Sequence, residues 1–289
     1  MNVGTWLAEA TERMSQCGIE QPRVEAEQLL MGVLQLNRMD LIHLRGLSDA
    51  KQWLDDRKGD WQMKLQQALE RRLDHEPLQY IVGCQSFYGY PIKVTPDVLI
   101  PRGDTEILVE KGLALIKGIK SPVILDVCSG SGCIPIAFAK ERPDATVYGT
   151  DISFAALAVA RENANINEVP VTFFEGDLLM PLMHSGLKFN LIASNPPYIP
   201  TEVVQGLMPE VKDHEPNLAL DGGEDGLDFY RRLATQCKEF LLSGGYLIWE
   251  IGHDQQQACE QILLAEGYND IVGYKDYQGY DRVVVAQMR

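Results

Sequence analysis

The chain has 289 residues and a formal net charge of −15, and this length favours two domains. A protein that holds a nucleic-acid backbone over a wide face needs many basic side chains there, so the charge argues against direct nucleic-acid binding. No apolar run approaches the ~20 residues that a membrane-spanning helix requires, so we expect no membrane contact.

The cysteines and the first residues indicate the compartment. The six cysteines are scattered and include no Cys-x-x-Cys pair, so neither a disulfide framework nor a metal site is indicated. The first residues lack the basic stretch and apolar core of a signal peptide. These features predict a cytoplasmic protein in a reducing setting, with no bound metal.

Apolar residues recur at helical spacing in residues 1–76. Pro22 suits the first turn of a helix, and Asp60 is predicted to cap a helix over residues 61–73. The predicted buried positions are Trp6, Leu7, Ala10, Met14, Val24, Leu29, Leu30, Val33, Leu65, Leu69 and Leu73. We therefore predict a small helical bundle over residues 1–76 and interpret it as a recognition domain.

Short β-like segments, separated by Gly and Pro, follow residue 76. They cover residues 80–82, 87–88 and 92–94, and they predict a β-hairpin linker over residues 77–100. The last predicted domain covers residues 101–289. Near its start, Asp104 or Thr105 is predicted to cap a helix over residues 106–117.

From residue 121 onward, strand and helix patterns alternate. The predicted strands are 123–127, 146–150, 171–174, 189–194 and 246–250, followed by an antiparallel pair at 271–274 and 282–286. Predicted helices over 134–140, 154–165, 227–241 and 255–265 separate them. This order predicts an α/β fold with a Rossmann-like, mostly parallel seven-stranded sheet. Ligands of such sheets bind at the carboxyl ends of the strands.

The first of these strands leads into a glycine turn, Cys128-Ser129-Gly130-Ser131-Gly132. Such a turn lets a ligand approach the backbone, and it precedes a helix N-terminus that favours negative charge. The dinucleotide pattern wants a further glycine where Pro135 stands, which counts against NAD or FAD, and no phosphate-binding Gly-Lys-Ser/Thr follows. The turn alone is a weak signal.

Three acidic residues, Asp126, Asp151 and Asp177, stand at successive strand ends. The carboxylate of Asp151 suits a ribose diol, because it can accept from both hydroxyls, and Asp177 could accept from an adenine amino group. Taken singly, each acid is more simply an ordinary strand-end residue. A ribose, an adenine and a small carboxylate, without a pyrophosphate, together favour S-adenosylmethionine as the cofactor.

Asn195-Pro196-Pro197-Tyr198 follows the fourth strand of this region. The two prolines remove backbone donors, and the Asn side chain adds an acceptor oxygen. Two acceptors suit the two hydrogens of a planar NH2, on an amide or on a base, and the Tyr ring offers a flat face. The alternative is a plain turn after a strand, since Asn-Pro commonly begins turns.

The chain resembles the HemK/PrmC family of methyltransferases. The resemblance rests on Pro101-Arg102-Gly103-Asp104-Thr105-Glu106, the glycine turn, Asn195 to Ile199, and Leu220-Asp221-Gly222-Gly223-Glu224-Asp225-Gly226-Leu227. It implies N5-methylation, by S-adenosylmethionine, of the glutamine in the Gly-Gly-Gln motif of class-1 peptide-chain release factors, a modification of translation termination. The predicted partner is therefore a release factor.

The resemblance also implies roles for residues. Cofactor contacts are expected from Cys128 to Gly132, from Asp126, Asp151, Asp177 and Asn195, and from Leu178 as an apolar contact beside the adenine. Substrate glutamine is expected at Asn195, Pro196, Pro197 and Tyr198, with Asn195, Pro196 and Tyr198 catalytic. The Asn195 oxygen and the Pro196 carbonyl would accept the amide hydrogens. Cys128 stands where the family usually has Gly, which costs little if its φ is negative.

Three alternatives remain open at this stage. A ribosomal-protein glutamine methyltransferase shares the Asn195–Tyr198 tetrapeptide, and so does a DNA or RNA amino-group methyltransferase. A non-catalytic protein that binds the methyl donor is the third. The acidic composition fits a protein partner better than a bare nucleic acid.

Overall fold

In the computed structural model, which describes residues 3–47 and 50–288, the chain forms two units. The helical unit extends to Gly83 and includes the later segment Pro209–His214. The sheet unit comprises Cys84–Met208 and the chain from Glu215 onward. The chain thus returns to the helical unit once, between the Asn195–Tyr198 tetrapeptide and the end of the sheet unit.

The helical unit has a core of large apolar side chains that includes Trp6, Leu29 and Trp61. Val24 is 46% exposed, so the prediction that it is buried is wrong. It precedes Leu29 by five residues, which places the two side chains about 140° apart around the helix axis, on different faces. Asp60 makes no side-chain cap bond, so that prediction is also wrong. The helices of this unit are α1 (Val3–Gln16), α2 (Pro22–Leu34), α3 (Arg38–Gly46), α4 (Ala50–Lys58), α5 (Trp61–Leu73), α6 (Leu78–Val82) and α11 (Pro209–Lys212).

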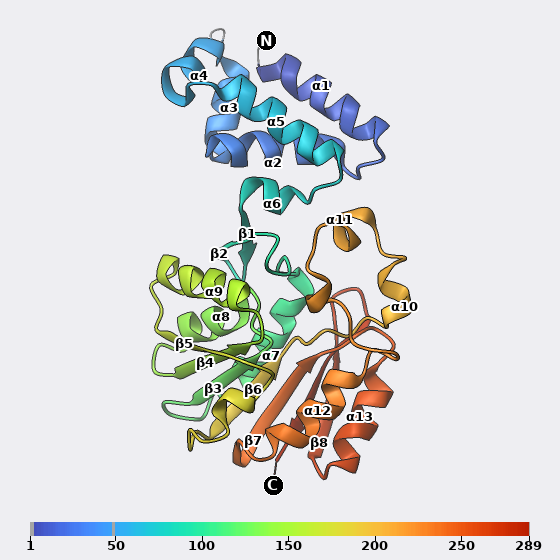
Figure 1. Ribbon diagram of the computed structural model, residues 1–289. Coiled ribbons are helices and arrows are strands. Elements are labelled where there is room, and N and C mark those ends of the chain that lie inside the picture. Colours follow the sequence, from blue (N-terminus) through green and yellow to red (C-terminus); the bar gives the residue numbers. More distant parts are fainter. Residues whose placement is uncertain (1–2, 48–49, 289) are drawn as a thin grey trace. The chain divides into compact units, whose positions relative to one another are not determined.

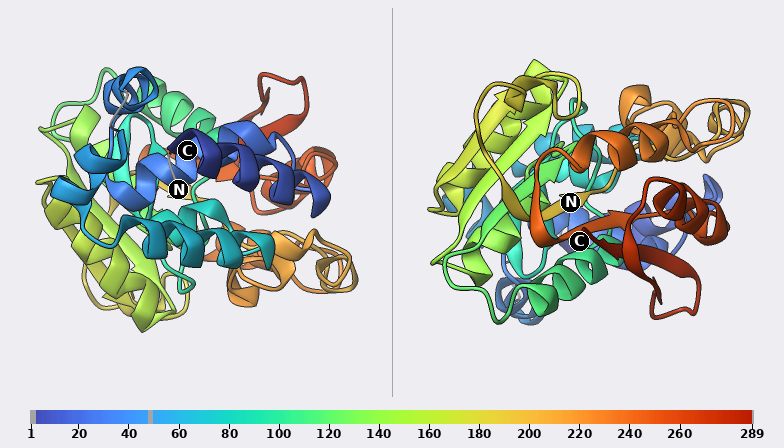
Figure 2. Two further views of the ribbon diagram at one scale, coloured as in Figure 1. Left: turned by 90° about the horizontal axis from the view of Figure 1, so that it is seen from above. Right: turned by 90° about the horizontal axis from the view of Figure 1, so that it is seen from below.

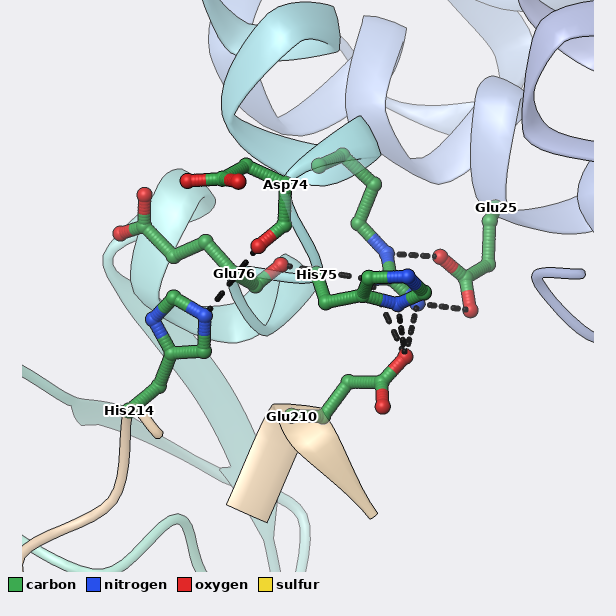
Figure 3. Close-up of polar contacts among 7 residues, drawn as sticks. Glu25, Asp74, His75, Glu76, Glu210 and His214 are labelled. Atoms are coloured by element: carbon green, nitrogen blue, oxygen red, sulfur yellow. Dashed lines mark hydrogen bonds and ion pairs between the residues drawn. The ribbon is translucent and has the colours of Figure 1, made fainter. Parts of the chain in front are cut away.

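A buried arginine joins three parts of the helical unit. Arg72 of α5 is 5% exposed, and its guanidinium lies 2.6 Å from Glu25 of α2 and 3.4 Å from Glu210 of α11. His75 Nδ1 lies 3.2 Å from the same Glu210 oxygen, and His214 contacts the Asp74 carbonyl (Figure 3). These contacts hold α11 on the helical unit.

The predicted β segment at residues 80–82 is wrong, because Leu78–Val82 forms the helix α6. The Pro77 carbonyl accepts from the amides of Tyr80 and Ile81, which closes a helical turn. A run this short has no period that separates strand from helix. The antiparallel hairpin is shorter than predicted and consists of β1 (Cys84–Phe87) and β2 (Tyr90–Lys93).

The sheet unit is built on a seven-stranded, mostly parallel sheet, which confirms the predicted fold class (Figures 1 and 2). The strand order is β5-β4-β3-β6-β7-β9-β8, and of these strands β9 runs opposite to the other six. Chain order reverses between β3 and β6, which is the switch point where such sheets bind ligands. The strands are β3 (Val123–Val127), β4 (Thr146–Asp151), β5 (Val171–Glu175), β6 (Phe189–Ser194), β7 (Leu241–Glu250), β8 (Asn269–Lys275) and β9 (Asp281–Gln287).

Helices cover the sheet in two groups. The first group consists of α7 (Glu106–Leu115), α8 (Cys133–Glu141) and α9 (Phe154–Ile166), and the second of α12 (Asp228–Cys237) and α13 (Gln256–Ala265). Shorter elements are η1 (Gly103–Thr105), η2 (Met180–Leu182), α10 (Thr201–Val204) and η3 (Asn217–Ala219). Thr105 precedes α7 but makes no cap bond, so the predicted cap is wrong. No helix in residues 3–47 or 50–288 is long and apolar enough to cross a membrane.

Candidate active site

The glycine turn and the tetrapeptide start side by side at the switch point. Val127, the last residue of β3, is the register partner of Ser194, the last residue of β6. The next residues, Cys128 and Asn195, therefore leave the sheet at the same edge. Sequence positions almost seventy residues apart meet because β3 and β6 are parallel neighbours.

A cavity of about 270 Å³ opens at this edge, near the lower end of the range for small-molecule sites, roughly 300–1,000 Å³. Nine of the predicted site residues line it: Cys128, Ser129, Gly130, Ser131, Asp151, Asp177, Leu178, Asn195 and Pro197. Four others, Asp126, Gly132, Pro196 and Tyr198, do not line it. The cavity thus contains most of the predicted cofactor positions.

Backbone amides fix Asp151 against the glycine turn. Its Oδ2 accepts from the Gly130 amide and its Oδ1 from the Ser153 amide, both at 2.8 Å. Burial raises the pKa of Asp151, although these amides oppose the shift. Each oxygen keeps a second lone pair for another donor. Asp151 therefore shapes the turn and still has acceptor capacity toward the cavity.

Cys128 has a φ of +63°, so the condition under which a Cys would be tolerated cheaply is not met. A side chain in the left-handed region is strained. Gly132 does not line the cavity and is needed for packing: its φ is +80°, and an added Cβ would lie 3.0 Å from the Ala160 Cβ. It allows α8 to start close to α9.

Asp126 lies behind the turn with no exposed surface. Neither of its carboxylate oxygens has a hydrogen-bond partner among the described residues. Burial raises its pKa well above the ordinary value. A buried, unpaired acid beside a cavity is characteristic of a functional site.

Asp177 and Leu178 lie at the cavity with two residues that the sequence did not suggest. Arg232 of α12 forms an ion pair with Asp177, and Phe229 of the same helix lines the cavity. Leu178 is buried, with a φ of +50°. Nothing in the sequence marked Arg232 or Phe229, because α12 lies some fifty residues farther along the chain.

A polar network lies behind the tetrapeptide. Asn195 Nδ2 donates to Thr105 Oγ1 at 3.4 Å, and the Tyr198 hydroxyl lies 3.5 Å from Glu250 Oε1. Glu250, the last residue of β7, is 1% exposed. Burial raises its pKa to about 7, against the lowering effects of Thr105, Arg282 and Asn195. The strand-end position that drew attention to Asp126 and Asp151 could also have indicated Glu250.

The Pro101–Glu106 segment holds the site through its polar side chains. Arg102 pairs with Glu215, which also accepts from the Ile100 amide at 3.2 Å. Asp104 lies 3.7 Å from Arg282 of β9, and Glu106 Oε1 accepts from the Tyr88 amide at 2.8 Å. These contacts place Thr105 beside Asn195.

The glycine-rich loop over residues 221–226 packs on the tetrapeptide backbone. A Cβ on Gly222 would lie 2.7 Å from the Tyr198 Cα, and one on Gly226 would strike the Tyr198 carbonyl oxygen. Asp221 Oδ1 accepts from Thr201 Oγ1 at 2.7 Å and from the Gly223 amide at 3.0 Å. Both glycines therefore allow the loop to approach the Tyr198 backbone closely, and the loop supports the tetrapeptide from this side.

Comparison with known proteins identifies both units. Residues 5–83 match the PrmC N-terminal domain, and residues 104–209 match the methyltransferase small domain. A methyltransferase structure from Pyrococcus furiosus has a TM-score of 0.50 at 16% identity, over 70% of this chain and 90% of that one. The T. thermophilus 16S rRNA N2 methyltransferase in complex with AdoMet and guanosine has a TM-score of 0.53 at 16% identity, over 71% and 50%. These two similarities show a shared fold.

Curated relatives are much closer in sequence. The release factor glutamine methyltransferase of Geobacter sulfurreducens is 42% identical over 94% of this chain and 91% of its own length. That of Moorella thermoacetica is 43% identical over 98% and 97%. This similarity extends through both units and confirms the resemblance drawn from the motifs: the chain belongs to the release factor glutamine methyltransferase family.

Proposed function

We propose that this protein transfers a methyl group from S-adenosylmethionine to the side-chain amide nitrogen of the Gly-Gly-Gln glutamine in class-1 release factors, giving N5-methylglutamine. The observation that carries the proposal is the position of Asn195. It lines one cavity together with the glycine turn and Asp151, so an amide held at the tetrapeptide would face a cofactor held at the turn. Family membership supports the same substrate.

The residues around the cavity fit S-adenosylmethionine. Cys133 and Ile134, at the N-terminus of α8, line the cavity, and a helix N-terminus suits the carboxylate of the cofactor. Asp126 does not line the cavity, so its cofactor contact stays a prediction. Asp151 keeps acceptor capacity for the ribose hydroxyls. Leu178 and Phe229 offer apolar contacts for the adenine. We assign these roles to the chain's residues as part of the proposal.

The side chains of the tetrapeptide act by positioning. When bound, S-adenosylmethionine supplies a sulfonium-borne methyl group whose carbon–sulfur bond breaks with the electron pair kept by sulfur. An amide nitrogen is a poor nucleophile, because its lone pair is delocalised into the carbonyl. The Asn195 oxygen and the Pro196 carbonyl would accept the two amide hydrogens, orient the nitrogen and stabilise its developing positive charge.

Such positioning can contribute roughly 7–11 kcal/mol to lowering a barrier. The methylated nitrogen then releases one proton to water. Tyr198 would pack against the amide plane, and its hydroxyl lies 3.5 Å from Glu250 Oε1. Pro196 and Pro197 are both buried, which keeps the acceptor carbonyls fixed.

The domain assignment belongs to the same proposal. We propose that residues 1–76 recognise the release factor, that residues 77–100 link the domains, and that residues 101–289 bind the cofactor. The acidic chain fits a protein substrate in the cytoplasm and no direct nucleic-acid contact.

Mass spectrometry of the acceptor tests the proposal. Purified protein and S-adenosylmethionine are incubated separately with a class-1 release factor, with ribosomes and with DNA. The expected result is one added methyl group on the Gly-Gly-Gln glutamine of the release factor. A release factor in which that glutamine is replaced by alanine is the control. Methylation of a ribosomal protein or of DNA instead would contradict the proposal.

A further inference from the structure

Glu250 ends β7 and Asn195 directly follows the neighbouring strand β6, so both lie at the carboxyl edge of the sheet. Ser194 of β6 is the register partner of Trp249 of β7, so the next residues of the two strands emerge together. Asn195 lines the cavity, whereas Glu250 does not and is 1% exposed. Glu250 therefore lies behind the residue that would hold the substrate.

Three donors face this carboxylate. The Tyr198 hydroxyl lies 3.5 Å from Oε1. Thr105 and Asn195 lie close enough to lower the pKa of Glu250, and its Oε2 has no hydrogen-bond partner among the described residues. Thr105 is buried and caps no helix, and its hydroxyl accepts from Asn195 Nδ2 at 3.4 Å. The contact with Thr105 therefore engages the nitrogen end of the Asn195 amide.

The orientation of that amide decides whether Asn195 can work. Its oxygen and nitrogen ends are nearly equal in size, but one only accepts and the other only donates. A substrate NH2 needs the oxygen, so the nitrogen must point away from the substrate. An ionised carboxylate accepts only, and it can stabilise just one of the two orientations.

We propose that Glu250 is a positioning residue for methyl transfer, which with Thr105 and Tyr198 holds Asn195 with Nδ2 inward and Oδ1 toward the substrate amide. The inference rests on the proposed function and adds to it a residue that fixes the geometry of the acceptor. Glu250 acts through Asn195 and Tyr198 and touches neither the substrate nor the cofactor.

The burial of Glu250 is costly, which is consistent with a functional reason for it. An isolated buried charge is strongly unfavourable. Arg282 is close enough to lower the pKa of Glu250, but its own ion pairs are with Asp276 at 3.1 Å and Asp104 at 3.7 Å. Among the residues that the structure describes, Glu250 thus has no ion-pair partner of its own.

Protonation of Glu250 would remove its preference for one orientation of the Asn195 amide, because a carboxylic acid also donates a hydrogen bond. The titratable or charged groups that influence Glu250 or are influenced by it are Asp104 of η1, Cys133 of α8, Tyr198 after β6, Tyr230 of α12 and Arg282 of β9. Burial outweighs them and raises the pKa of Glu250 to about 7. Turnover is therefore expected to fall as the pH drops through about 7.

The test compares kcat, KM and the pH profile of wild type and Glu250→Gln on a release factor, with S-adenosylmethionine binding measured by calorimetry. Gln has nearly the same shape but also donates, so it no longer selects one Asn195 orientation. We expect kcat to fall by about 10- to 100-fold, the usual effect of losing a group that orients a reacting side chain. Cofactor binding is expected to change by less than about threefold, and the activity loss below about pH 7 disappears.

Two further variants complete the experiment. Glu266→Gln makes the same substitution at a partly exposed ion pair with Lys238, away from the cavity, and is expected to keep wild-type kcat and pH profile. Thr105→Val removes the hydroxyl at constant shape and is expected to lower kcat without weakening cofactor binding. If Glu250→Gln fails to fold, the kcat of Thr105→Val tests the positioning role instead.

The outcomes separate the two proposals. Wild-type kcat and pH profile in Glu250→Gln, or wild-type kcat in Thr105→Val when only that variant folds, would overturn the positioning role. Wild-type protein that leaves the Gly-Gly-Gln glutamine unmethylated would overturn the proposed function, and the positioning role with it.

Discussion

Arg72 in the helical unit and Glu250 in the sheet unit are both almost fully buried, but only Arg72 has opposite charges in direct contact. Its guanidinium lies 2.6 Å from Glu25 and 3.4 Å from Glu210. Glu250 and the buried Asp126 of β3 make no ion pair among the described residues, and burial raises the pKa of both.

The presence or absence of an ion-pair partner distinguishes a buried charge that stabilises the fold from buried acids that serve the site. Removing one partner of a buried pair leaves an uncompensated charge and lowers stability. Buried acids without a counter-charge instead lie beside the cavity, where perturbed pKa values mark functional groups. Substitutions in the helical unit should therefore change the free energy of unfolding, and substitutions at the edge of the sheet should change turnover.

The largest effect is expected for Asn195→Ala. Loss of the acceptor oxygen should reduce turnover at least 10²- to 10³-fold, the range for removing one group that stabilises developing charge. S-adenosylmethionine should still bind measurably in calorimetry, because the glycine turn and Asp151 are intact. Asn269→Ala, in β8 at the far edge of the sheet, is the matched control. Undiminished turnover in Asn195→Ala would refute the catalytic role.

Arg72→Gln should destabilise the helical unit by about 3 kcal/mol, since it removes one partner of a buried ion-pair cluster. The matched control is Arg13→Gln, which breaks the exposed pair between Arg13 and Glu70 and should cost less than about 1 kcal/mol. Hydrogen exchange resolved by region measures both effects. Equal protection in the two variants would mean that burial of Arg72 has no special weight.

Glu250 should make stability depend on pH. Its pKa is raised from 4.5 to about 7 in the folded chain, so between these values the folded state binds more protons than the unfolded state. Stability contributed by this group is then lost as the pH rises through that window. Glu250→Gln should remove a loss of roughly 2–3 kcal/mol between about pH 5 and pH 8.

Thermal unfolding across this pH range measures the effect. The variant is expected to be more stable than wild type at the upper end while turning over more slowly, a combination that a merely structural glutamate would not give. Parallel stability curves for the two proteins would contradict the burial argument.

The fold could be predicted from the sequence because its signals are local. Strands such as Val123–Val127 are continuous apolar runs between turn residues, and the strand-end rule then brought Asp151 and Asn195 to one edge. Failures also have local causes: residues 80–82 are too few to show a period, and neither Asp60 nor Thr105 uses its side chain as a cap.

What the sequence could not supply were contacts between distant segments. Arg72 and Glu210 are separated by 138 positions, and Thr105, Asn195 and Glu250 come from three parts of the chain. No local pattern encodes such meetings. The predicted roles of the site residues stay predictions, although nine of those residues share one cavity.

Replacing Cys128 is expected to have the smallest effect on stability. The sequence showed that a Cys stands where the family usually has Gly, but only the structure shows that its backbone is strained. With φ at +63°, a residue with a Cβ costs about 1–2 kcal/mol, whereas Gly adopts this conformation freely but loses about 0.5–1 kcal/mol more entropy on folding. Cys128→Gly should therefore stabilise the sheet unit by no more than about 1 kcal/mol. Thermal unfolding without cofactor measures this, with Cys84→Gly at an exposed strand position as the control that should destabilise. A less stable Cys128→Gly would mean that the packing of the thiol outweighs the backbone strain.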